Sequence, residues 1–541
     1  MKLHSHTRTI EDKCYEVWRS PGRFTKNPDI VETKSGRLML VYSDNDSHWS
    51  QETQVLTILA SDDQGRTWFK LSEVDTADLR KGDERLVTPR LSCLADGRLA
   101  VLIDHDDYGH FHQEQSCGIV LYWSHDNGQT WTAAQDTGII GFEPDRIIEL
   151  PDGRLAVVTQ VIFSKSQQCG LMLYTSQDGG KSWQEISTIA HDGYHLFCEG
   201  GLIILDSGKE FAVVMRENHN GGIPSFVSFS RDGGFSWTEP QMLPFHLHRP
   251  YGKQLPDGRV MVTGRNLLGG IGTYAWCGNL KAEAGYYEIG GPMAHYKAYF
   301  EDGAFVMENG PDWDCRYSLL PPENSKSEVY IEAELRVEGE NGKPVAFLCI
   351  SGLSSPALLS IAPDGVSIAD LWDPSPVVDT YKRVDMTRYR KVGLRSRRGI
   401  LTVEVDGEIF INKWITPECY ITNDAYAPEP GKRTQFGQVG AAGKSYWKHV
   451  RYRAINPTMS DCAFRWDAGA GEYPDKYQRE RLTLVHANVH SRDRQYHWPD
   501  HGYSSWLMLA DGTIVFVDYT TAGDKGMEGH LVGARFRPED V

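Results

Sequence analysis

The octapeptide Ser-Gln-Asp-Gly-Gly-Lys-Ser-Trp, residues 176–183, decides the fold because the chain carries its pattern four times. The other copies of S-x-D-x-G-x-[ST]-W occupy residues 61–68, 124–131 and 230–237. So specific an octapeptide does not recur by chance, and the pattern therefore indicates a repeat architecture. In each copy the Asp accepts backbone N–H groups in a tight turn, the Gly supplies a positive φ, and the apolar Trp anchors the turn.

A second repeat, a short glycine turn followed by an apolar run, occurs six times. The turn glycines are Gly36, Gly97, Gly153, Gly208, Gly258 and Gly512. The first five are 61, 56, 55 and 50 residues apart, and the sixth follows after 254. Asp-Gly between apolar runs predicts a hairpin, and this spacing is near that of propeller blades. The sequence therefore predicts an all-β fold, a six-bladed β-propeller with about 200 residues inserted before its sixth unit.

We expect three regions in the chain. Residues 1–278 form blades one to five, 279–475 an inserted antiparallel β-sandwich of jelly-roll or lectin-like type, and 476–541 blade six. The strand-like segment 13–19 is available to complete the last blade, and the segment 483–486 is expected in the sixth unit. The strands expected in the insertion are 329–337, 345–351, 357–362, 391–396, 400–405 and 439–454.

Three tryptophans of the insertion have two interpretations. Trp372, Trp414 and Trp447 form either a platform on which sugars stack or part of the core, since aromatic side chains dominate cores.

Composition narrows the class of protein. A net charge of −17 argues against nucleic acid and anionic membranes as partners, and no apolar run approaches the 18 residues of a membrane span. The ten cysteines form no C-x-x-C pair, so we expect neither a metal site nor a cofactor. The start, Met-Lys-Leu-His-Ser-His-Thr-Arg, is not a signal peptide, which favours a cytoplasmic location. A secreted protein whose signal has been removed would look the same.

Candidate site residues follow from propeller geometry, because one end of every inner hairpin faces the central axis. We therefore selected polar residues about nine positions before and eight after each turn glycine. Those before the turns are Lys26, Arg90, Arg146, Glu199, Arg249 and Tyr503; those after are Asp44, His105, Arg216, Asn266 and Asp518. Cations, carboxylates and one tyrosine in equivalent places suit an anionic ligand. The alternative is a set of salt bridges between blades.

The octapeptides resemble the Asp boxes of the sialidase superfamily, whose members are six-bladed propellers. Tyr503-Ser504-Ser505 followed by Asp511-Gly512 is similar to the stretch with the family's nucleophilic tyrosine. Cys198-Glu199 with Arg216 resembles the family's glutamate-and-arginine blade. The resemblance covers about 1–278 and 480–541.

The resemblance implies a role for each matching residue. Glu199 assists Tyr503, and Arg216 binds the substrate carboxylate. Arg249, or else Arg265, corresponds to the family's third arginine. Asp44 and Asp46 are both candidates for its acid/base aspartate.

The chain departs from the family at its first arginine. The family's Arg-Ile-Pro is matched by Lys26-Asn27-Pro28, and a lysine cannot form the bidentate fork with a carboxylate. The family's glutamate that steadies this arginine is matched by the shorter Asp518. These changes indicate a different substrate or an altered pose.

The predicted function is removal of a terminal acidic sugar, such as sialic acid, from an oligo- or polysaccharide by an exo-acting, retaining glycoside hydrolase. The anionic sugar would repel a carboxylate nucleophile but not a neutral tyrosine. The first alternative is a lyase or hydrolase of uronate-containing polysaccharide that uses Tyr503 with a histidine. The candidates for that histidine are His105, His110, His112, His195, His246, His248, His497 and His501. The second is a non-catalytic glycan-binding propeller. The oligomeric state stays open.

Overall fold

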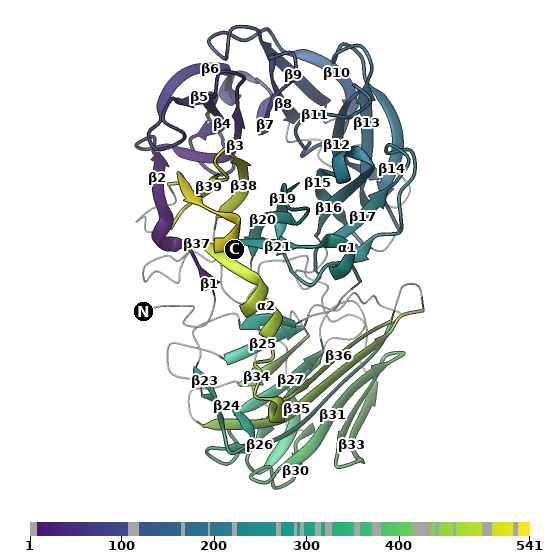
Figure 1. The fold of residues 1–541 in the computed structure, drawn as a ribbon. Helices are drawn as coiled ribbons and strands as arrows, with labels where there is room; N and C mark the ends of the chain where they lie inside the picture. Colours follow the sequence, from purple (N-terminus) through teal and green to yellow (C-terminus); the bar gives the residue numbers. More distant parts are fainter. Residues whose placement is uncertain are drawn as a thin grey trace.

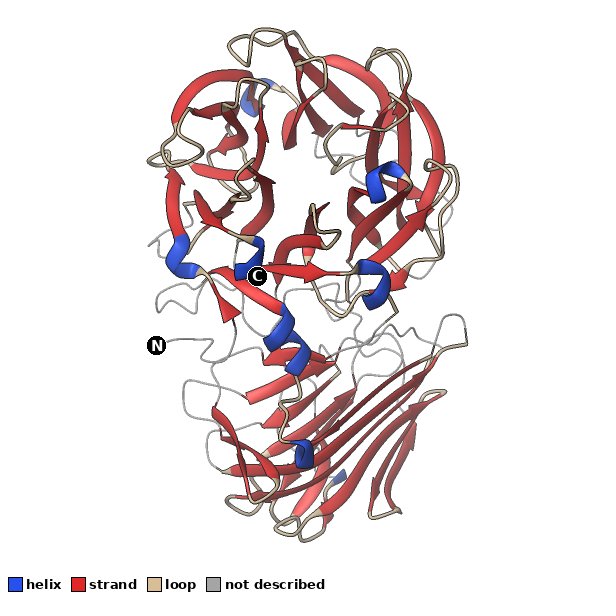
Figure 2. Cartoon of the chain, viewed as in Figure 1, coloured by secondary structure: helices blue, strands red, loops and turns tan. Residues whose placement is uncertain are grey.

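The predicted all-β fold is confirmed by the sheets of the chain. The computed structural model describes residues 8–541 apart from 107–117, 164–167, 193–194, 219–223, 267–271, 286–288, 293–296, 309–314, 320–326, 351–356, 370–379, 415–433, 439–442, 458–460, 489–499 and 523–527. Six sheets form a ring, and two larger sheets lie beside it (Figure 1). Strands make up nearly all of the regular structure (Figure 2).

Four consecutive four-stranded antiparallel sheets form the first part of the ring, each in chain order. Their strands are β3 (Phe24–Glu32), β4 (Leu38–Asn45), β5 (Thr53–Ser61) and β6 (Phe69–Asp78); β7 (Arg85–Cys93), β8 (Leu99–Asp106), β9 (Gly118–Ser124) and β10 (Gln135–Ile140); β11 (Ile148–Glu149), β12 (Leu155–Phe163), β13 (Gln168–Ser176) and β14 (Gln184–Ala190); and β15 (Phe197–Leu205), β16 (Glu210–Glu217), β17 (Phe226–Ser230) and β18 (Gln241–Met242).

Segments distant in sequence complete the last two sheets. The fifth contains β19 (His248–Gln254), β20 (Val260–Asn266), β21 (Gly272–Gly278), β37 (Leu482–Ala487) and the parallel β1 (Arg8–Thr9). The sixth contains β38 (His501–Met508), β39 (Ile514–Thr520), β40 (His530–Phe536) and, paired with β40, β2 (Cys14–Trp18).

The segment 483–486 was expected in the sixth unit, and that expectation is wrong. It lies in β37, which pairs with β21 as an outer strand of the fifth sheet. The chain leaves this blade after its third strand and returns to it after the insertion. The count of residues between turn glycines cannot reveal on which sheet the returning strand pairs.

The insertion consists of two sheets that enclose one apolar core. One contains β22 (Ile289–Pro292), β25 (Cys315–Leu319), β34 (Gln435–Gln438), β27 (Ala346–Ile350), β28 (Ala357–Ala362), β29 (Gly365–Ala369) and β30 (Lys382–Arg383). The other contains β23 (Lys297–Glu301), β24 (Ala304–Glu308), β35 (Lys444–Ile455), β26 (Glu328–Glu338), β31 (Arg390–Arg397), β32 (Ile400–Val405), β33 (Glu408–Trp414) and β36 (Cys462–Asp467).

The residues of the insertion alternate as a half-buried sheet requires. Along β26 every second side chain, from Val329 to Val337, is buried. Trp447 is fully buried in the core, which decides its interpretation as a core residue. Trp372 and the side chain of Trp414 lie outside the described residues.

Two short helices flank the insertion, α1 (Leu280–Glu283) and α2 (Lys476–Arg481), and α2 contacts both β22 and β37. Among the described residues, no helix is long and apolar enough to cross a membrane.

Each octapeptide fixes its own turn and also joins two blades. In residues 176–183 the Asp178 carboxylate accepts the N–H groups of Lys181 and Ser182 at 2.9 Å. The glycine at the fifth position of each octapeptide has a positive φ, and its carbonyl accepts a hydrogen bond from the preceding sheet. The donor–acceptor pairs are Tyr15–Gly65, Ser72–Gly128, Gln135–Gly180 and Ser187–Gly234. The repeated turns therefore hold neighbouring blades together.

The packing at Gly180 predicts a measurable difference between two glycines. Gly180 and Gly153 both have a positive φ, but a Cβ at Gly180 would lie 2.7 Å from the Trp123 ring, whereas a Cβ at Gly153 meets nothing within 4 Å. We expect Gly153→Ala to cost about 1 kcal/mol of unfolding free energy and Gly180→Ala about 2–4 kcal/mol. Urea denaturation measures both. Equal costs would show that the turn is not seated against the preceding blade.

Candidate active site

One residue near the start of each blade has a left-handed backbone conformation, and these six residues mark the central mouth. They are Asn27, Thr88, Glu143, Glu199, Arg249 and Tyr503, with φ between 46° and 61°. Five lie where the pairing of the first and second strands shifts register, as in a β-bulge. A bulge redirects side chains, and here the last four members converge on one cluster.

The hydroxyl of Tyr503 lies at the centre of this cluster. It donates to Glu199 Oε1 at 2.9 Å and lies 3.3 Å from Glu143 Oε1. Burial, reinforced by the two carboxylates, raises the pKa of Tyr503 well above its ordinary value. The hydroxyl is therefore a proton donor that is neutral at physiological pH until a base removes its proton.

Glu199 can be that base. Its Oε1 accepts from Arg216 Nη1 at 2.8 Å, and its Oε2 accepts the backbone N–H of Arg249 at 3.0 Å. Burial alone would raise the pKa of Glu199, but the guanidinium groups of Arg216, Arg249 and Arg265 outweigh it and lower the pKa to about 2. Glu199 is thus ionised and aligned with the tyrosine hydroxyl.

Glu143 is the residue of this cluster that sequence reasoning missed. Its carboxylate lies 3.7 Å from Arg249 Nη1, and its backbone N–H donates to Asp104 Oδ2 at 3.2 Å. Burial and the Glu143 charge raise the pKa of Asp104 well above its ordinary value. The signal was available, because the other five left-handed residues precede their turn glycine by nine positions and Glu143 precedes Gly153 by ten.

Arg146, which sequence reasoning selected in place of Glu143, binds side chains of the first and sixth blades. It forms an ion pair with Asp29 and donates to Ser505 Oγ at 2.9 Å. This position belongs to the blade-to-blade salt bridges that the sequence left open as an alternative.

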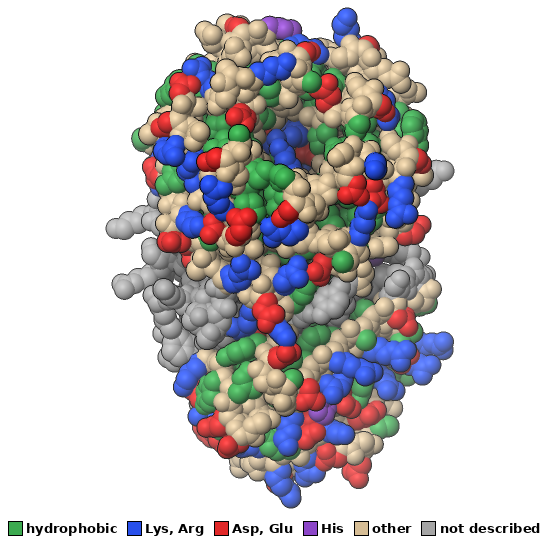
Figure 3. Space-filling model, in the orientation of Figure 1, with side chains coloured by type: hydrophobic (Ala, Val, Ile, Leu, Met, Phe, Trp, Pro, Cys, Tyr) green, Lys and Arg blue, Asp and Glu red, His purple; other side chains and the backbone are tan. Residues whose placement is uncertain are grey.

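Arginines surround the tyrosine. The guanidinium carbons of Arg249 and Arg90 lie 5.4 and 6.0 Å from the centre of the Tyr503 ring. Burial, with the charge of Arg249, lowers the pKa of Arg90 to about 10. Lysine and arginine side chains gather in the hollow at the centre of the ring (Figure 3). The cluster therefore concentrates positive charge around one neutral hydroxyl.

Lys26 is a buried residue that directly precedes Asn27, the left-handed residue of the first blade. Its Nζ donates to the His48 carbonyl at 2.7 Å, and burial lowers its pKa against the opposing charge of Asp500. The Asp500 carboxylate lies 2.5 Å from His48 Nδ1 and accepts from Tyr519 Oη at 2.6 Å. Asp500 thus supplies the negative charge near Lys26, the role expected of Asp518.

Asp518 and His105 are placed elsewhere. The Asp518 carboxylate accepts from Thr273 Oγ1 at 2.6 Å and lies 2.9 Å from His486 Nε2, which joins the sixth blade to the fifth. His105 Nδ1 lies 2.9 Å from Glu84 Oε2 at the end of β8. His110 and His112 lie outside the described residues. None of the contacts described for Asp518 and His105 reaches Tyr503.

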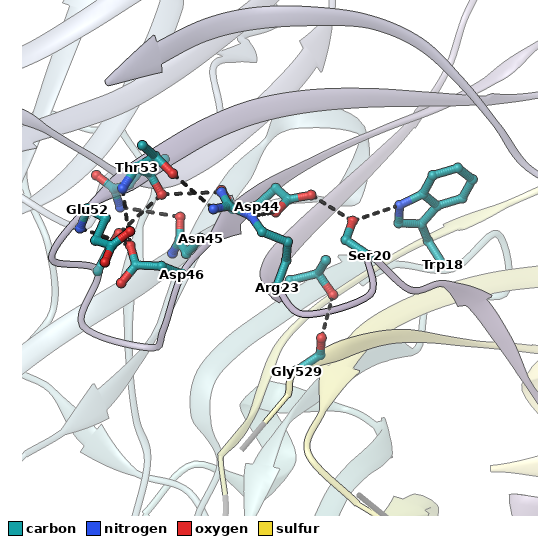
Figure 4. A network of polar contacts seen from close by, with 12 residues as sticks. Trp18, Ser20, Arg23, Asp44, Asn45, Asp46, Glu52, Thr53 and Gly529 are labelled. Carbon is teal, nitrogen blue, oxygen red and sulfur yellow. Dashed lines mark hydrogen bonds and ion pairs between the residues drawn. The ribbon is translucent and has the colours of Figure 1, made fainter. Parts of the chain in front are cut away.

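Asp44 and Asp46 are held by local contacts in the first blade (Figure 4). Asp44 pairs with Arg23 Nε at 2.6 Å and accepts from Ser20 Oγ at 2.6 Å, beside a surface cleft of about 480 Å³. The Asp46 carboxylate accepts the backbone N–H groups of residues 51–53 at 3.1–3.2 Å. The structure therefore does not bring either aspartate to the hydroxyl of Tyr503.

A model of a BNR repeat-like domain matches residues 108–264 of the chain. No match was found among curated proteins.

Several solved structures are similar at low identity. A protein of unknown function from Dyadobacter fermentans DSM 18053 is 17% identical, with a TM-score of 0.44 over 58% of this chain and 95% of the other. The α-L-arabinanase of Penicillium chrysogenum complexed with arabinobiose is 18% identical, with a TM-score of 0.40 over 55% of this chain and 92% of the other. Trypanosoma rangeli sialidase is 11% identical, with a TM-score of 0.35 over 88% of this chain and 97% of the other.

The depressed pKa of Glu199 makes its contribution to stability depend on pH. A carboxyl whose folded pKa is about 2 stabilises the folded state above its unfolded pKa, and this contribution is lost as the pH falls. We expect Glu199→Gln to lower the unfolding free energy by roughly 3 kcal/mol at pH 7, and by about 1 kcal/mol less at pH 3.5. Urea denaturation at both pH values measures this difference.

The matched control is Glu185→Gln, which changes an exposed carboxylate on β14. It should alter stability little at either pH. A cost of Glu199→Gln that did not change with pH would contradict the electrostatic account of the site.

Proposed function

We propose that the chain is an exo-acting, retaining glycoside hydrolase that removes a terminal acidic sugar, of the sialic acid class, with Tyr503 as nucleophile. The observation that carries this proposal is the Tyr503 hydroxyl, hydrogen-bonded at 2.9 Å to the ionised Glu199 among buried arginines. A neutral nucleophile is suited to an anomeric carbon that bears a carboxylate, because an anionic side chain would be repelled.

In the first step, Glu199 takes the hydroxyl proton while the Tyr503 oxygen attacks the anomeric carbon. The leaving-group oxygen must receive a proton as its bond to that carbon breaks. We assign this donation to Glu143 in its protonated form, because Asp44 and Asp46 are held by contacts in the first blade. When the sugar enters, its anomeric carbon separates Glu143 from the tyrosine.

In the second step, water replaces the leaving group. The ionised Glu143 takes a proton from the water, whose oxygen attacks the anomeric carbon as the bond to Tyr503 breaks. Glu199 returns its proton to the tyrosine oxygen. Two inversions at one carbon give net retention of configuration.

The arginines bind the substrate carboxylate in this proposal. Arg216 and Arg249 flank the catalytic pair, and Arg90 and Lys26 contribute charge from the neighbouring blades. Arg249 donates from Nη1 and Nη2 to the carbonyls of Glu143 and Pro144, at 3.2 and 2.8 Å, so its guanidinium is already oriented. A charged, oriented donor requires little reorganisation when an anion binds.

A second candidate is a hydrolase for a neutral glycoside that uses Glu143 and Glu199 directly. Since both carboxylate oxygens lie within 3.3 Å of one hydroxyl, they are at most about 6 Å apart, which matches retaining rather than inverting enzymes. The lyase alternative has less support, because none of the described histidines contacts the Tyr503 hydroxyl. A non-catalytic propeller would bind the sugar without turnover.

Turnover of a 4-methylumbelliferyl sialoside tests the nucleophile. We expect release by the wild type and at least a 100-fold lower kcat for Tyr503→Phe, because the phenyl ring has no oxygen to form the bond. The matched control is Tyr122→Phe, which removes a hydroxyl bonded to Asp75 at 2.6 Å on the second blade. If the wild type cleaves a neutral 4-methylumbelliferyl glycoside but not the sialoside, the second candidate is favoured.

Leaving-group dependence tests Glu143. We expect Glu143→Gln to lower kcat/KM by about 100-fold or more for sialyllactose, whose sugar leaving group needs a proton. The loss should be much smaller for the aryl sialoside, whose leaving group departs without one. Equal losses on both substrates would contradict the acid/base role of Glu143. Retention is tested separately, by proton NMR of the anomer that is released first.

A further inference from the structure

Trp49 is a large apolar residue of the propeller that is exposed close to the candidate active site. Its side chain is 60% exposed, whereas Trp276 and Trp506 are fully buried. A single exposed apolar side chain is ordinary on a protein surface and needs no explanation by itself. Trp49, however, is next to the candidate active site. Its ring centre lies 5.9 Å from the ammonium group of Lys26, which directly precedes the left-handed residue of the first blade.

The loop that carries Trp49 is held by a specific set of contacts. Asp46 accepts the backbone N–H groups of residues 51–53 and also binds the hydroxyl of Ser50. These bonds close the segment between β4 and β5 into a compact turn. Asp46, selected from the sequence for proton transfer, thus shapes the loop that carries the exposed Trp49.

The ring of Trp49 is also held in place by contacts on the side of the candidate active site. The His48 ring packs edge-on against it at a centroid distance of 4.9 Å, and Asp500 fixes His48 through a 2.5 Å contact. Asp500 in turn accepts from Tyr519, whose ring centre is 6.5 Å from that of Tyr503. These contacts therefore link the ring of Tyr503 to the exposed indole.

We propose that Trp49 forms a subsite for the leaving group, binding a neutral pyranose to which the acidic sugar is linked. This proposal rests on the proposed function. An indole presents an apolar face with negative charge density, which complements the C–H face of a pyranose. The terminal sugar would occupy the mouth beside Tyr503, and the next sugar would extend outward toward Lys26 and Trp49.

The substrate series must separate the leaving-group sugar from the terminal sugar. Sialyllactose carries a neutral pyranose in the leaving group, and a methyl sialoside carries none. We expect Trp49→Ala to raise KM for sialyllactose at least tenfold with kcat within twofold, and to leave kcat/KM for the methyl sialoside unchanged. Trp49→Phe, which keeps an aromatic face, should recover most of the loss.

The control is Phe235→Ala, which removes an aromatic side chain that is 61% exposed on the octapeptide turn of residues 230–237. It should change neither substrate. A Trp49→Ala effect of the same size on both substrates, or no effect on sialyllactose, would overturn the proposal.

A binding experiment keeps the subsite distinguishable from the proposed reaction. If the wild type turns over neither sialoside, the proposed function fails, and lactose binding then tests Trp49 directly. Saturation-transfer NMR should show lactose signals with the wild-type chain that are lost with Trp49→Ala and kept with Phe235→Ala. Equal lactose signals from wild type and Trp49→Ala would overturn the subsite.

Discussion

The left-handed residue near the start of each blade is the constraint on which the site depends. A non-glycine residue with positive φ costs on the order of 1 kcal/mol, and six such residues lie near the starts of the blades. Hydrogen bonds between blades offset this strain. The backbone N–H groups of Glu143, Glu199 and Arg249 donate to side chains of the preceding blade, namely Asp104, Gln160 and Glu199. The bonds that join blades therefore also orient the side chains of the mouth.

Glu199 belongs to both systems at once. One carboxylate oxygen bonds the fifth blade through Arg249, and the other accepts from Tyr503 and Arg216. Its charge is stabilised by Arg216, Arg249 and Arg265, and the last two donate to backbone carbonyls of other blades. A base held in this way stays ionised without water around it, and electrostatic preorganisation of this kind lowers the reorganisation needed for proton transfer. The position of the Glu199 carboxylate that joins the blades is therefore also the position that aligns it with the Tyr503 hydroxyl.

The repeats made the all-β propeller predictable, because turn chemistry and spacing are local signals. Glu199, Arg249 and Tyr503 were also found, since each lies nine residues before its turn glycine. Glu143 was missed because one additional residue precedes Gly153, and a preference for cations moved the choice to Arg146. The partners of Asp44, Asp46 and Asp518 could not be predicted, since neither the local contacts of the first two nor the bonds of Asp518 to the fifth blade follow from their distance to a turn glycine. The outer strand β37 depended on where the chain re-enters a sheet, which spacing does not encode.

The closure of the ring by β2 and β40 has a consequence for how the chain folds during synthesis. The two strands lie more than 500 residues apart, so β2 stays unpaired with β40 until nearly the whole polypeptide has been synthesised. The local hairpins of the early blades and the sandwich can fold during this interval, because domains generally fold as units as they are made. Tyr503 arrives with the final blade. The proposed nucleophile is thus the last residue of the candidate site to be synthesised, and assembly of that site coincides with the slow long-range step that completes the fold.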